Sequence, residues 1–533
     1  MKISFYGADR CVTGSCHGLE VNGKKILVDC GLQQGRDEVD NRELPFNPAD
    51  IDFVLVTHAH IDHTGRIPLL VKNGFHGTII ASRLTCELMT IMLKDSAHIQ
   101  ESDAEWLNKK GKRAGRSDVE PLYTIEDAER VKDYIKACEY GQKVSVCEGV
   151  EAVFTDAGHL LGSSSIKLTL TENGVTKSIV FSGDIGNCDQ PIIRDPQYIS
   201  EADYVVMEST YGDREHEKTQ SYTDDLAAVI DETLAKGGNV VIPSFAVGRT
   251  QELLYFIREM KERNLVKSVP NFPVYIDSPL AKEATEVFDG DLRGYLDDDA
   301  MKLVHGGVNM YKFPGLMMTK TSEESKALNE DKTPKVIISA SGMCDAGRIR
   351  HHLKHNLWRP ECTIVFVGYQ AEGTLGSNLL GGAKVVRLFG EEIAVRAKLV
   401  NYKGLSSHAG LSGLITWIEH YNPKPKHVFV VHGDVEVVPV FVENLKGRGF
   451  EVHAPEYTEV YDLADNIMVS VGYTPERVAK RAEVIERGSA SYQKLQNIGL
   501  QLQQVILHNK GGTNKDINKF AEQLNELIAK WER

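Results

Sequence analysis

The sequence predicts an α/β fold in which one domain is inserted into the chain of another, and three observations support this prediction. In residues 1 to about 211, short apolar runs typical of β-strands alternate with turns. In residues 213 to 398, strands alternate with amphipathic helices, which is typical of a parallel sheet flanked by helices. Histidines in short loops then return at His408 and His432. The middle region is therefore predicted to be an insert.

The expected elements follow in chain order. Residues 1–5 enter directly into a strand, which predicts that no signal peptide precedes it. Two helices are expected in the first region, near residues 84–107 and 125–140. In the middle region, the pattern predicts strands at 239–243, 273–277 and 335–339, and helices that begin at Arg249, at Leu280, near Ala346 and at Leu375.

The composition is that of a globular protein with several structural units. The chain has 533 residues, of which 42% are hydrophobic and 26% charged. It contains no apolar run of about 18 residues, so the sequence predicts no membrane span. The nine cysteines are scattered and form no Cys-x-x-Cys pair. This argues against a disulfide framework and a zinc ribbon, and it favours a cytoplasmic location.

The net charge of −14 constrains how this chain could bind nucleic acid. Phosphate binding depends on where Lys and Arg lie locally, so overall acidity does not exclude it. The charge predicts instead that the basic residues are confined to a channel.

The most informative motif is residues 57–65, Thr-His-Ala-His-Ile-Asp-His-Thr-Gly, which follows the apolar run 53–56. It places His58, His60, Asp62 and His63 within six positions. Imidazole and carboxylate groups suit Zn²⁺, and a strand that runs into a loop lets alternate residues point at one spot. A polar surface loop with incidental histidines is the alternative. The H-x-H-x-D-H spacing strongly favours a dinuclear metal site.

A metal site of this kind needs more ligands than one loop can supply. His159, Asp184 and His432 each follow a short apolar run and lie beside a glycine, which permits close backbone approach. Any one of them alone is more simply explained as a polar residue at a strand end. Together with residues 57–65 they complete a ligand set.

These motifs, with residues 5–7, 12–17 and 26–31, resemble metallo-β-lactamase-fold hydrolases. Within that fold the chain looks like a β-CASP ribonuclease of the prokaryotic type similar to cleavage and polyadenylation specificity factor. The resemblance extends to about Gly433 and covers most of the chain. It implies an αββα sandwich with an inserted β-CASP domain, and the residues that follow are expected to form a helical C-terminal extension. The expected limits are 1–211 and 399–472 for the metallo-β-lactamase domain, 212–398 for the β-CASP domain and 473–533 for the extension.

The resemblance also implies which residues bind metal, with two Zn²⁺ in each chain. Asp29 would lie behind the ligands and orient a histidine, as metal-bound imidazoles require. A strand-terminal cap is the alternative for Asp29. One zinc ion would be held by His58, His60 and His159, the other by Asp62, His63 and His432, with Asp184 bridging them.

Asp62, Glu208 and His408 are the residues expected to carry catalysis. Glu208 ends an apolar strand, and His408 lies in a loop of small residues. A carboxylate that orients an imidazole fixes its tautomer and raises its basicity, so His408 is expected to protonate the leaving oxygen. In the family, Glu208, His408 and His432 occupy the motifs named A, B and C. RNA-acting members resemble this chain in having His at motif C, whereas DNA-acting members typically have Val, so RNA is the expected partner.

Three loops of the insert are expected to bind RNA phosphates. Small residues and free backbone N–H groups at helix starts suit phosphate oxygens, and open α/β sheets bind ligands at strand ends. Ordinary helix capping is the simpler explanation of each loop taken alone, but all three match β-CASP loops. The expected phosphate-binding residues are Ser244, Arg249, Ser339, Ser341, Gly342, Gly373 and Thr374.

The residues after about Tyr473 depart from the catalytic pattern. Thr474 and Pro475 are a good helix start, with Thr as N-cap and Pro at the first position. Apolar residues then repeat at helical spacing. This stripe is expected to cover the catalytic domain, which base rates slightly favour, or to join a second subunit in a homodimer. Its members are Leu495, Ile498, Leu502, Val505 and Ile506, then Phe520, Leu524, Leu527, Ile528 and Trp531.

The sequence therefore predicts a zinc-dependent ribonuclease that hydrolyses RNA phosphodiester bonds in RNA processing or decay. Cleavage within the chain is the leading expectation, and stepwise removal from a 5′ end is left open because both use the same chemistry. Two alternatives are a hydrolase of small esters, thioesters or lactams on the same fold, and an inactive RNA-binding scaffold. The inserted domain argues against the first, and the complete ligand set argues against the second.

Overall fold

The computed structural model describes residues 1–35, 39–113, 117–217, 220–371 and 373–475, and then 498–499, 502, 505–506 and 514–531. Met1–Pro475 forms one compact unit, and Glu476–Arg533 forms another.

The first sheet begins and ends the compact unit. In β1, side chains alternate between the core face and the outer face, so that Ile3 and Phe5 are buried. The strands from β3 to β6 run parallel, and the pairs between β3 and β23 are antiparallel. Its order is β23 (Ile467–Ser470), β22 (Val460–Asp462), β1 (Lys2–Phe5), β2 (His17–Val21), β3 (Lys24–Val28), β4 (Phe53–Leu55), β5 (Thr78–Ser82) and β6 (Ile135–Cys138).

The second sheet joins a meander to three parallel pairs. β7 to β10 pair antiparallel, and β10, β11, β20 and β21 pair parallel. As a result β8, β10, β11 and β20 all run in one direction, and their carboxyl ends share one edge. The order is β21 (Val452–His453), β20 (His427–Val430), β11 (Tyr204–Met207), β10 (Val175–Phe181), β9 (Ser164–Glu172), β8 (Val150–Asp156) and β7 (Lys143–Cys147).

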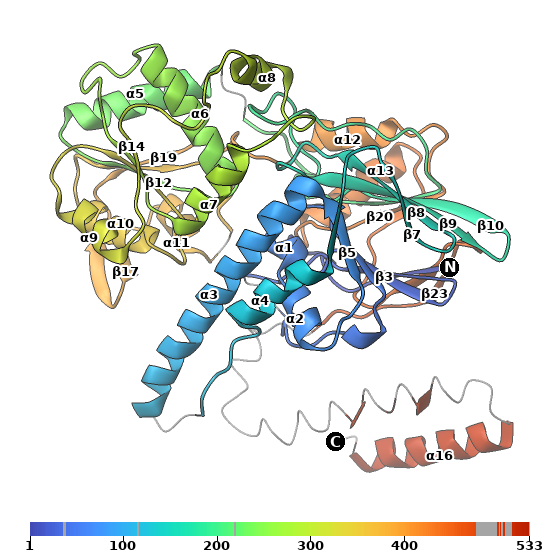
Figure 1. Ribbon diagram of the computed structural model, residues 1–533. Coiled ribbons are helices and arrows are strands. Elements are labelled where there is room, and N and C mark those ends of the chain that lie inside the picture. The colour runs from blue at the N-terminus through green and yellow to red at the C-terminus, as the bar shows by residue number, and fades with distance from the viewer. Residues whose placement is uncertain are drawn as a thin grey trace. The chain divides into compact units, whose positions relative to one another are not determined.

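These two sheets pack face to face between helices, which is the αββα sandwich that the sequence predicts. Apolar side chains of both sheets, among them Phe5, Phe154 and Phe429, form the core between them. Figure 1 shows α12 and α13 on one side of the sandwich and α1 to α4 on the other. The helices are α1 (Ile61–Thr64), α2 (Ile67–Lys72), α3 (Arg83–Arg113), α4 (Ile125–Arg130), α12 (Leu411–Glu419) and α13 (Val437–Gly447), with single 3-10 turns at Pro48–Asp50 and Val131–Tyr134.

The third sheet is built from the middle of the chain, and all of its pairs are parallel. Side chains of β12 alternate between two cores: Val240 and Ile242 pack toward α5, α6 and α7, while Val241 packs toward α10 and α11. The predicted β-CASP architecture, a parallel sheet flanked by helices, is confirmed. Its order is β14 (Leu316–Met318), β13 (Val274–Ile276), β15 (Val336–Ser339), β12 (Val240–Pro243), β16 (Thr363–Phe366) and β19 (Lys398–Asn401).

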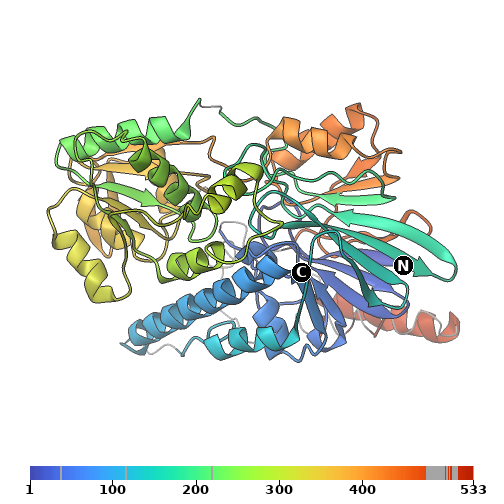
Figure 2. The same ribbon diagram turned by 45° about the horizontal axis from the view of Figure 1, so that its top comes forward.

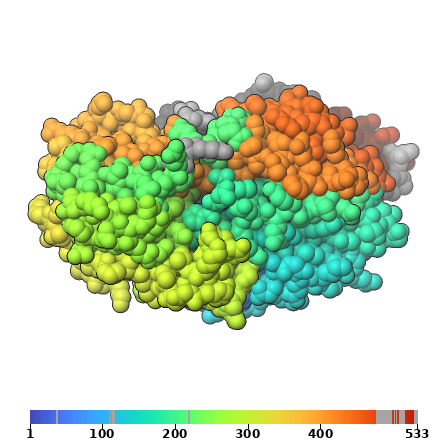
Figure 3. Space-filling view, turned by 90° about the horizontal axis from the view of Figure 1, so that it is seen from above, coloured from blue at the N-terminus to red at the C-terminus, as the bar shows by residue number. Residues whose placement is uncertain are grey.

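Around the third sheet lie helices and one hairpin. Figure 2 shows α3 running alongside α7, and both helices contribute to one continuous core. In the space-filling view, the green and yellow surface of this part lies against the teal and orange surface of the two-sheet part (Figure 3). The elements are α5 (Tyr222–Ala235), α6 (Arg249–Glu262), α7 (Pro279–Phe288), α8 (Asp298–His305), α9 (Ser322–Glu330), α10 (Ile349–Asn356), α11 (Leu375–Leu380) and the hairpin β17 (Val385–Leu388) and β18 (Glu391–Ala394).

Two of the helices expected from the sequence differ from those in the structure. The helix predicted near 125–140 is wrong in its second half, because β6 (Ile135–Cys138) pairs with β5 and extends the first sheet. The helix expected near Ala346 begins at Ile349. The last strand of the third sheet, β19, lies across the predicted boundary at residue 398, and the domain limits stay predictions.

The second unit contains α16 (Asn514–Trp531), so the predicted helical extension is present. α16 carries part of the predicted apolar stripe. The helix predicted to begin at Thr474 and Pro475 would extend into residues that lie outside the described part of the chain, and Leu495 of the stripe also lies outside it. Within the described part of the chain, no helix is both long and apolar enough to cross a membrane.

Candidate metal centre

The predicted ligands come together where strands of the two sandwich sheets end. His159, Asp184 and His432 follow β8, β10 and β20, whose carboxyl ends share one edge of the second sheet. The loop and short helix after β4 bring His58 to His63 to the same place from the first sheet.

Local backbone geometry shapes these loops. Gly183 has φ +57, and a Cβ there would lie 2.8 Å from the Cβ of Thr57, so only glycine fits between the two ligand loops. The turn that carries His159 is closed by Ser163, whose Oγ accepts hydrogen bonds from the His159 and Leu160 amides at 3.0 and 3.1 Å. The apolar runs and glycines of the sequence therefore form rigid strand ends that hold the ligands.

A first group of ligand atoms comprises His58, His60, His159 and Asp184. His60 Nδ1 lies 3.0 Å from His58 Nε2 and 3.2 Å from His159 Nε2. Asp184 Oδ2 lies 3.4 Å from His58 Nε2 and 3.5 Å from His159 Nε2. Three imidazoles and one carboxylate oxygen thus face a common centre.

A second group comprises Asp62, His63, Asp184 and His432. His63 Nε2 lies 3.4 Å from His432 Nε2 and 3.3 Å from Asp184 Oδ1. His432 Nε2 lies 3.4 Å from Asp62 Oδ2. Asp184 is common to both groups and presents a different carboxylate oxygen to each.

The donor atoms of both groups fit zinc. With Zn–N distances of about 2.0–2.1 Å, neighbouring ligand atoms of a tetrahedral site lie about 3.3 Å apart. The separations of 3.0 to 3.5 Å in the first group match this value. Asp184 Oδ1 is buried and accepts no hydrogen bond from the described residues, which is costly unless a cation is its partner. Imidazole and carboxylate are ligands that zinc prefers.

Burial and charge set the protonation of the histidines. Burial lowers the pKa of His58, and the neighbouring His63 lowers it further, which leaves the neutral ring that metal binding requires. His159 shows the same direction, with burial as the main cause. For His63, burial acts to lower the pKa, but the carboxylates of Asp184 and Asp29 hold it well above its usual value. A divalent cation would replace that proton.

Asp29 lies behind the ligands, where the sequence places it. Its Oδ2 is 2.8 Å from His63 Nδ1, and its Oδ1 accepts a hydrogen bond of 2.8 Å from the Thr57 amide. This contact turns Nε2 of His63 toward Asp184.

Two threonines that sequence reasoning missed also support the ligands. Thr57 Oγ1 donates to Asp29 Oδ2 at 2.8 Å, and Thr210 Oγ1 lies 3.1 Å from His432 Nδ1. Thr57 directly precedes His58, and Thr210 lies two residues after Glu208. This closeness to predicted site residues was the signal in the sequence that could have identified them.

Glu208 and His408 form a pair beside the two ligand groups. His408 Nδ1 lies 3.1 Å from both carboxylate oxygens of Glu208, and Nε2 lies 3.9 Å from Asp184 Oδ2. Glu208 is buried and also accepts a 2.6 Å hydrogen bond from the Ile185 amide. Burial acts to lower the pKa of His408, but the Glu208 and Asp184 carboxylates raise it to about 9.

The centre opens to solvent on one side. The side chains of Asp62 and His408 are each 21% exposed, whereas those of His58, His63 and Asp184 are at most 2% exposed. A substrate would therefore approach past Asp62 and His408.

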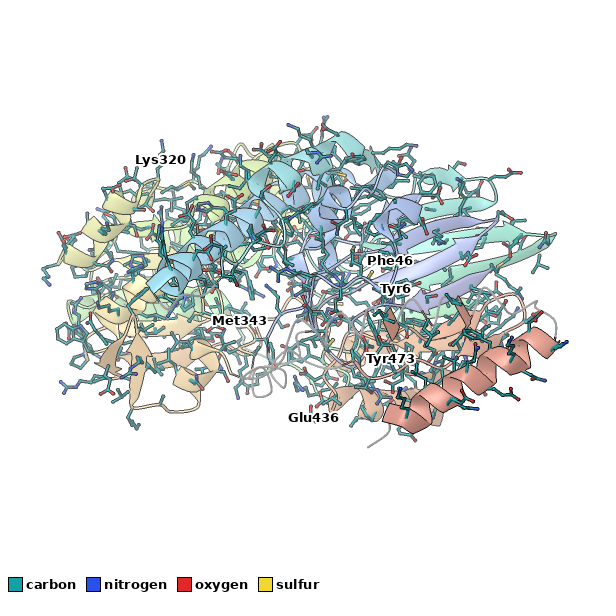
Figure 4. All side chains as sticks on the ribbon, turned by 90° about the horizontal axis from the view of Figure 1, so that it is seen from below. Tyr6, Phe46, Lys320, Met343, Glu436 and Tyr473 are labelled. Carbon is teal, nitrogen blue, oxygen red and sulfur yellow. The ribbon has the colours of Figure 1, made fainter. Side chains whose placement is uncertain are left out.

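The predicted phosphate loops lie at one edge of the third sheet. The Ser244 amide donates to the Ser339 carbonyl at 3.1 Å, and Gln370 Nε2 donates to the Gly342 carbonyl at 2.9 Å. Gly248 faces the two-sheet part, because a Cβ there would lie 2.9 Å from Leu160 Cδ1, beside His159. Met343, in the loop after Ser341, lies toward the middle of the molecule in Figure 4.

Several polar groups of these loops already have protein partners. Arg249 is buried and pairs with Glu252 one turn along α6. Ser339 Oγ donates to the Asp277 carbonyl at 2.9 Å, and Thr374 caps α11 by accepting from the Ser377 amide. Ser244 Oγ and Ser341 Oγ bond within their own loops, Gly342 packs under Phe245, and Gly373 has open space beside its Cα. The phosphate-binding role of these residues stays a prediction.

A buried polar cluster in the insert was not singled out from the sequence. Asp277, at the end of β13, is fully buried. Its carboxylate accepts from Ser325 Oγ at 2.5 Å and from Arg348 Nη1 at 2.7 Å, and it lies 2.6 Å from His352 Nε2. Although burial acts to raise it, the hydrogen bonds with His352 and Ser325 hold the pKa of Asp277 below its usual value. The cluster ties α9 and α10 to the carboxyl end of β13, at the edge where the phosphate loops lie.

Three family models match the chain in order. Residues 10–198 match the metallo-beta-lactamase superfamily, residues 250–379 match the Beta-Casp domain, and residues 392–455 match the Zn-dependent metallo-hydrolase RNA specificity domain. The last of these spans His408 and His432.

Curated relatives agree with these matches. Ribonuclease TTHA0252 of Thermus thermophilus is 36% identical over 460 residues, which cover 86% of this chain and 99% of the relative. An RNase J-like protein of Methanocaldococcus jannaschii is 30% identical over 81% of this chain and 92% of its own length. Transcription termination factor FttA of the same organism is 29% identical over 81% of this chain and 67% of its own length.

The sandwich fold with His and Asp clusters at its strand ends defines a zinc-dependent metallo-hydrolase of the metallo-β-lactamase superfamily. Within that superfamily the chain belongs to the β-CASP ribonuclease family, as its motifs predict.

Proposed function

We propose that this protein is an endoribonuclease that hydrolyses RNA phosphodiester bonds with two zinc ions per chain and leaves a 5′-phosphate and a 3′-hydroxyl. The observation that carries the proposal is the pair of four-residue ligand groups that share Asp184, beside the His408–Glu208 pair. The family and the similarity to a ribonuclease over 99% of that protein's length support RNA as the substrate.

His58, His60 and His159 would hold one zinc ion and Asp62, His63 and His432 the other, with Asp184 between them. Zinc supplies Lewis acidity and makes a water nucleophilic near neutral pH. Asp29 and Thr57 fix the ring of His63, and Thr210 fixes that of His432.

His408 is proposed to donate a proton to the leaving 3′ oxygen. It is exposed on the open side of the centre, and Glu208 accepts from Nδ1, so Nε2 is left to face the substrate. The carboxylate also favours the protonated ring, which is the form a general acid needs. Glu208 acts through His408 and is a positioning residue.

The loops after β12, β15 and β16 are proposed to guide RNA phosphates toward the centre, because they share one edge of the third sheet and Gly248 in the first of them packs beside Leu160. The residues proposed for this role are Ser244, Arg249, Ser339, Ser341, Gly342, Gly373 and Thr374. RNA is the proposed partner and the cytoplasm the proposed location. The small-substrate hydrolase is less well supported, since it gives the third sheet no role.

A circular RNA tests the mode of cleavage, because it has no end for an exonuclease to engage. Incubation with zinc-loaded protein should linearise it, and the product should carry a 5′-phosphate. If the circle stays intact while a linear 5′-phosphorylated RNA is shortened stepwise, the protein is a 5′ exonuclease instead. Elemental analysis of the same preparation should give close to two zinc ions per chain.

A further inference from the structure

The hairpin of β17 and β18 ends in a turn that carries a phenylalanine where a small residue is expected. Leu388 pairs with Glu391, so Phe389 and Gly390 form a two-residue turn, and their φ values are +52 and +86. Two positive φ values are typical of a type I′ turn, which favours Asn-Gly, and a bulky residue is rarely found there. Phe389 is also 47% exposed. A strained backbone under an exposed ring indicates that the ring has a use outside the fold.

The ring of Phe389 lies against the first turn of α10. It stacks on His351 with the ring centroids 4.3 Å apart and 20° between the planes, and the central carbon of the Arg350 guanidinium lies 5.0 Å from its centroid. Figure 1 shows the hairpin projecting from the insert next to α10. The loop that precedes α10 contains Ser341 and Gly342, two of the proposed phosphate-binding residues. An RNA strand that follows these loops would therefore reach Phe389 at the start of the helix.

The start of α10 is basic within an acidic chain. Residues 348–359 contain four Lys or Arg side chains and no Asp or Glu, although the net charge of the chain is −14. Lys354 is paired with Glu391 at 2.6 Å, but within the described part of the chain no carboxylate pairs with Arg350. Arg350 is thus held by an aromatic ring instead of an acid, and its charge stays available to an anion.

We propose that Phe389 and Arg350 form a second contact for single-stranded RNA, in which a base stacks on the Phe389 ring and Arg350 binds a neighbouring phosphate. The inference rests on the proposed ribonuclease function and extends it to the substrate beyond the cleaved bond. An aromatic ring beside a guanidinium is the combination that binds the bases and phosphates of a single strand. The bases of a duplex are already stacked on one another, so a duplex would not use this contact.

Phe389→Asn tests the proposal, because it removes the ring and favours the turn. Binding is measured with an oligouridine of about 20 nucleotides and the zinc-loaded full chain, in a His408→Ala background that slows cleavage. Phe389→Asn should weaken this binding by about 5- to 150-fold, the range that stacking of one base on an aromatic side chain gives. The midpoint of thermal unfolding should not fall, because Asn is favoured where φ is positive. A ring that served only packing would give a lower midpoint and unchanged affinity.

Three further variants sharpen the test. Phe389→Trp should keep the affinity, since it keeps a stacking surface. Arg350→Gln should reduce the slope of log affinity against log salt by about 0.7, the value for one phosphate contact on a single strand. Tyr198→Ala is the matched control, because Tyr198 is 43% exposed and stacks on a histidine, His420, in the two-sheet part. It should change neither quantity.

Cleavage of a short RNA separates this contact from the metal centre. With His408 intact, Phe389→Asn should cleave an RNA of about 6 nucleotides at the wild-type rate, because so short a strand need not reach the hairpin. Equal affinities of Phe389→Asn and its parent for the longer RNA would overturn the proposal, and so would slower cleavage of the short one, which would place the effect at the centre. Binding of the longer RNA that depends on Phe389, in a wild-type chain that cleaves no RNA, would keep this contact and refute the proposed hydrolysis instead.

Discussion

If Glu208 acts through His408, the effects of the two residues on the rate should not multiply. His408→Ala removes the proposed proton donor, and loss of a general acid costs about 10²–10⁴ in rate. Glu208→Gln keeps the size of the side chain and an oxygen that can accept from the Ile185 amide, but it removes the charge that faces His408 Nδ1 at 3.1 Å. A hydrogen bond to a charged group contributes about 1.5–3 kcal/mol, or roughly 10- to 150-fold in rate.

Single-turnover cleavage of end-labelled RNA by the wild type, both single variants and the double variant measures this coupling. We expect the double variant to be as slow as His408→Ala, within about threefold, because Glu208 has nothing left to position. Zinc content, measured on the same preparations, should stay at the wild-type value in all four. Losses that multiply in the double variant would show that Glu208 acts independently of His408, and loss of zinc from His408→Ala would make that residue a ligand.

Three further substitutions test other parts of the structure. Asp184→Ala should lose zinc and activity together, because both ligand groups use this carboxylate, whereas His432→Ala should lower zinc occupancy only at the second group; retained activity in Asp184→Ala would remove its shared role. Arg249→Ala should weaken RNA binding and flatten its salt dependence without changing zinc content. Arg258→Ala, which removes an equally buried arginine of the same helix whose partner Glu262 is exposed, should not weaken it; equal affinities of the two variants would mean that the loop only caps the helix. Asp277→Ala should lower the free energy of unfolding by about 3–5 kcal/mol, seen as a lower midpoint in urea, and an unchanged midpoint would contradict the weight given to this buried cluster.

The loops that carry the candidate ligands could be predicted because each candidate ligand is indicated by the local sequence. An apolar strand followed within three residues by His or Asp beside glycine indicates a side chain held at a rigid strand end, as at His159, Asp184 and His432. Residues 57–65 carry four ligand-type side chains in one loop. Their convergence on Asp184 is a property of the fold, and the family resemblance provided it.

Other features depend on contacts between distant segments, which spacing alone does not reveal. Residues 135–138 became a strand because β5 offered a parallel partner, although the local pattern favoured a helix. The cluster around Asp277 became visible only when α9 and α10 packed against the end of β13. The exposed ring of Phe389 could not be predicted either, since apolar residues in a sequence predict burial.

The most direct test of the account is incubation of zinc-loaded wild-type protein and Asp184→Ala with the same sequence made as end-labelled RNA and as DNA. The account predicts that the wild type cleaves the RNA internally, leaves the DNA intact and loses its activity in the presence of a chelator, while Asp184→Ala cleaves neither. Intact RNA with zinc-containing wild-type protein, or cleavage of DNA at a comparable rate, would contradict the assignment of this centre to RNA hydrolysis.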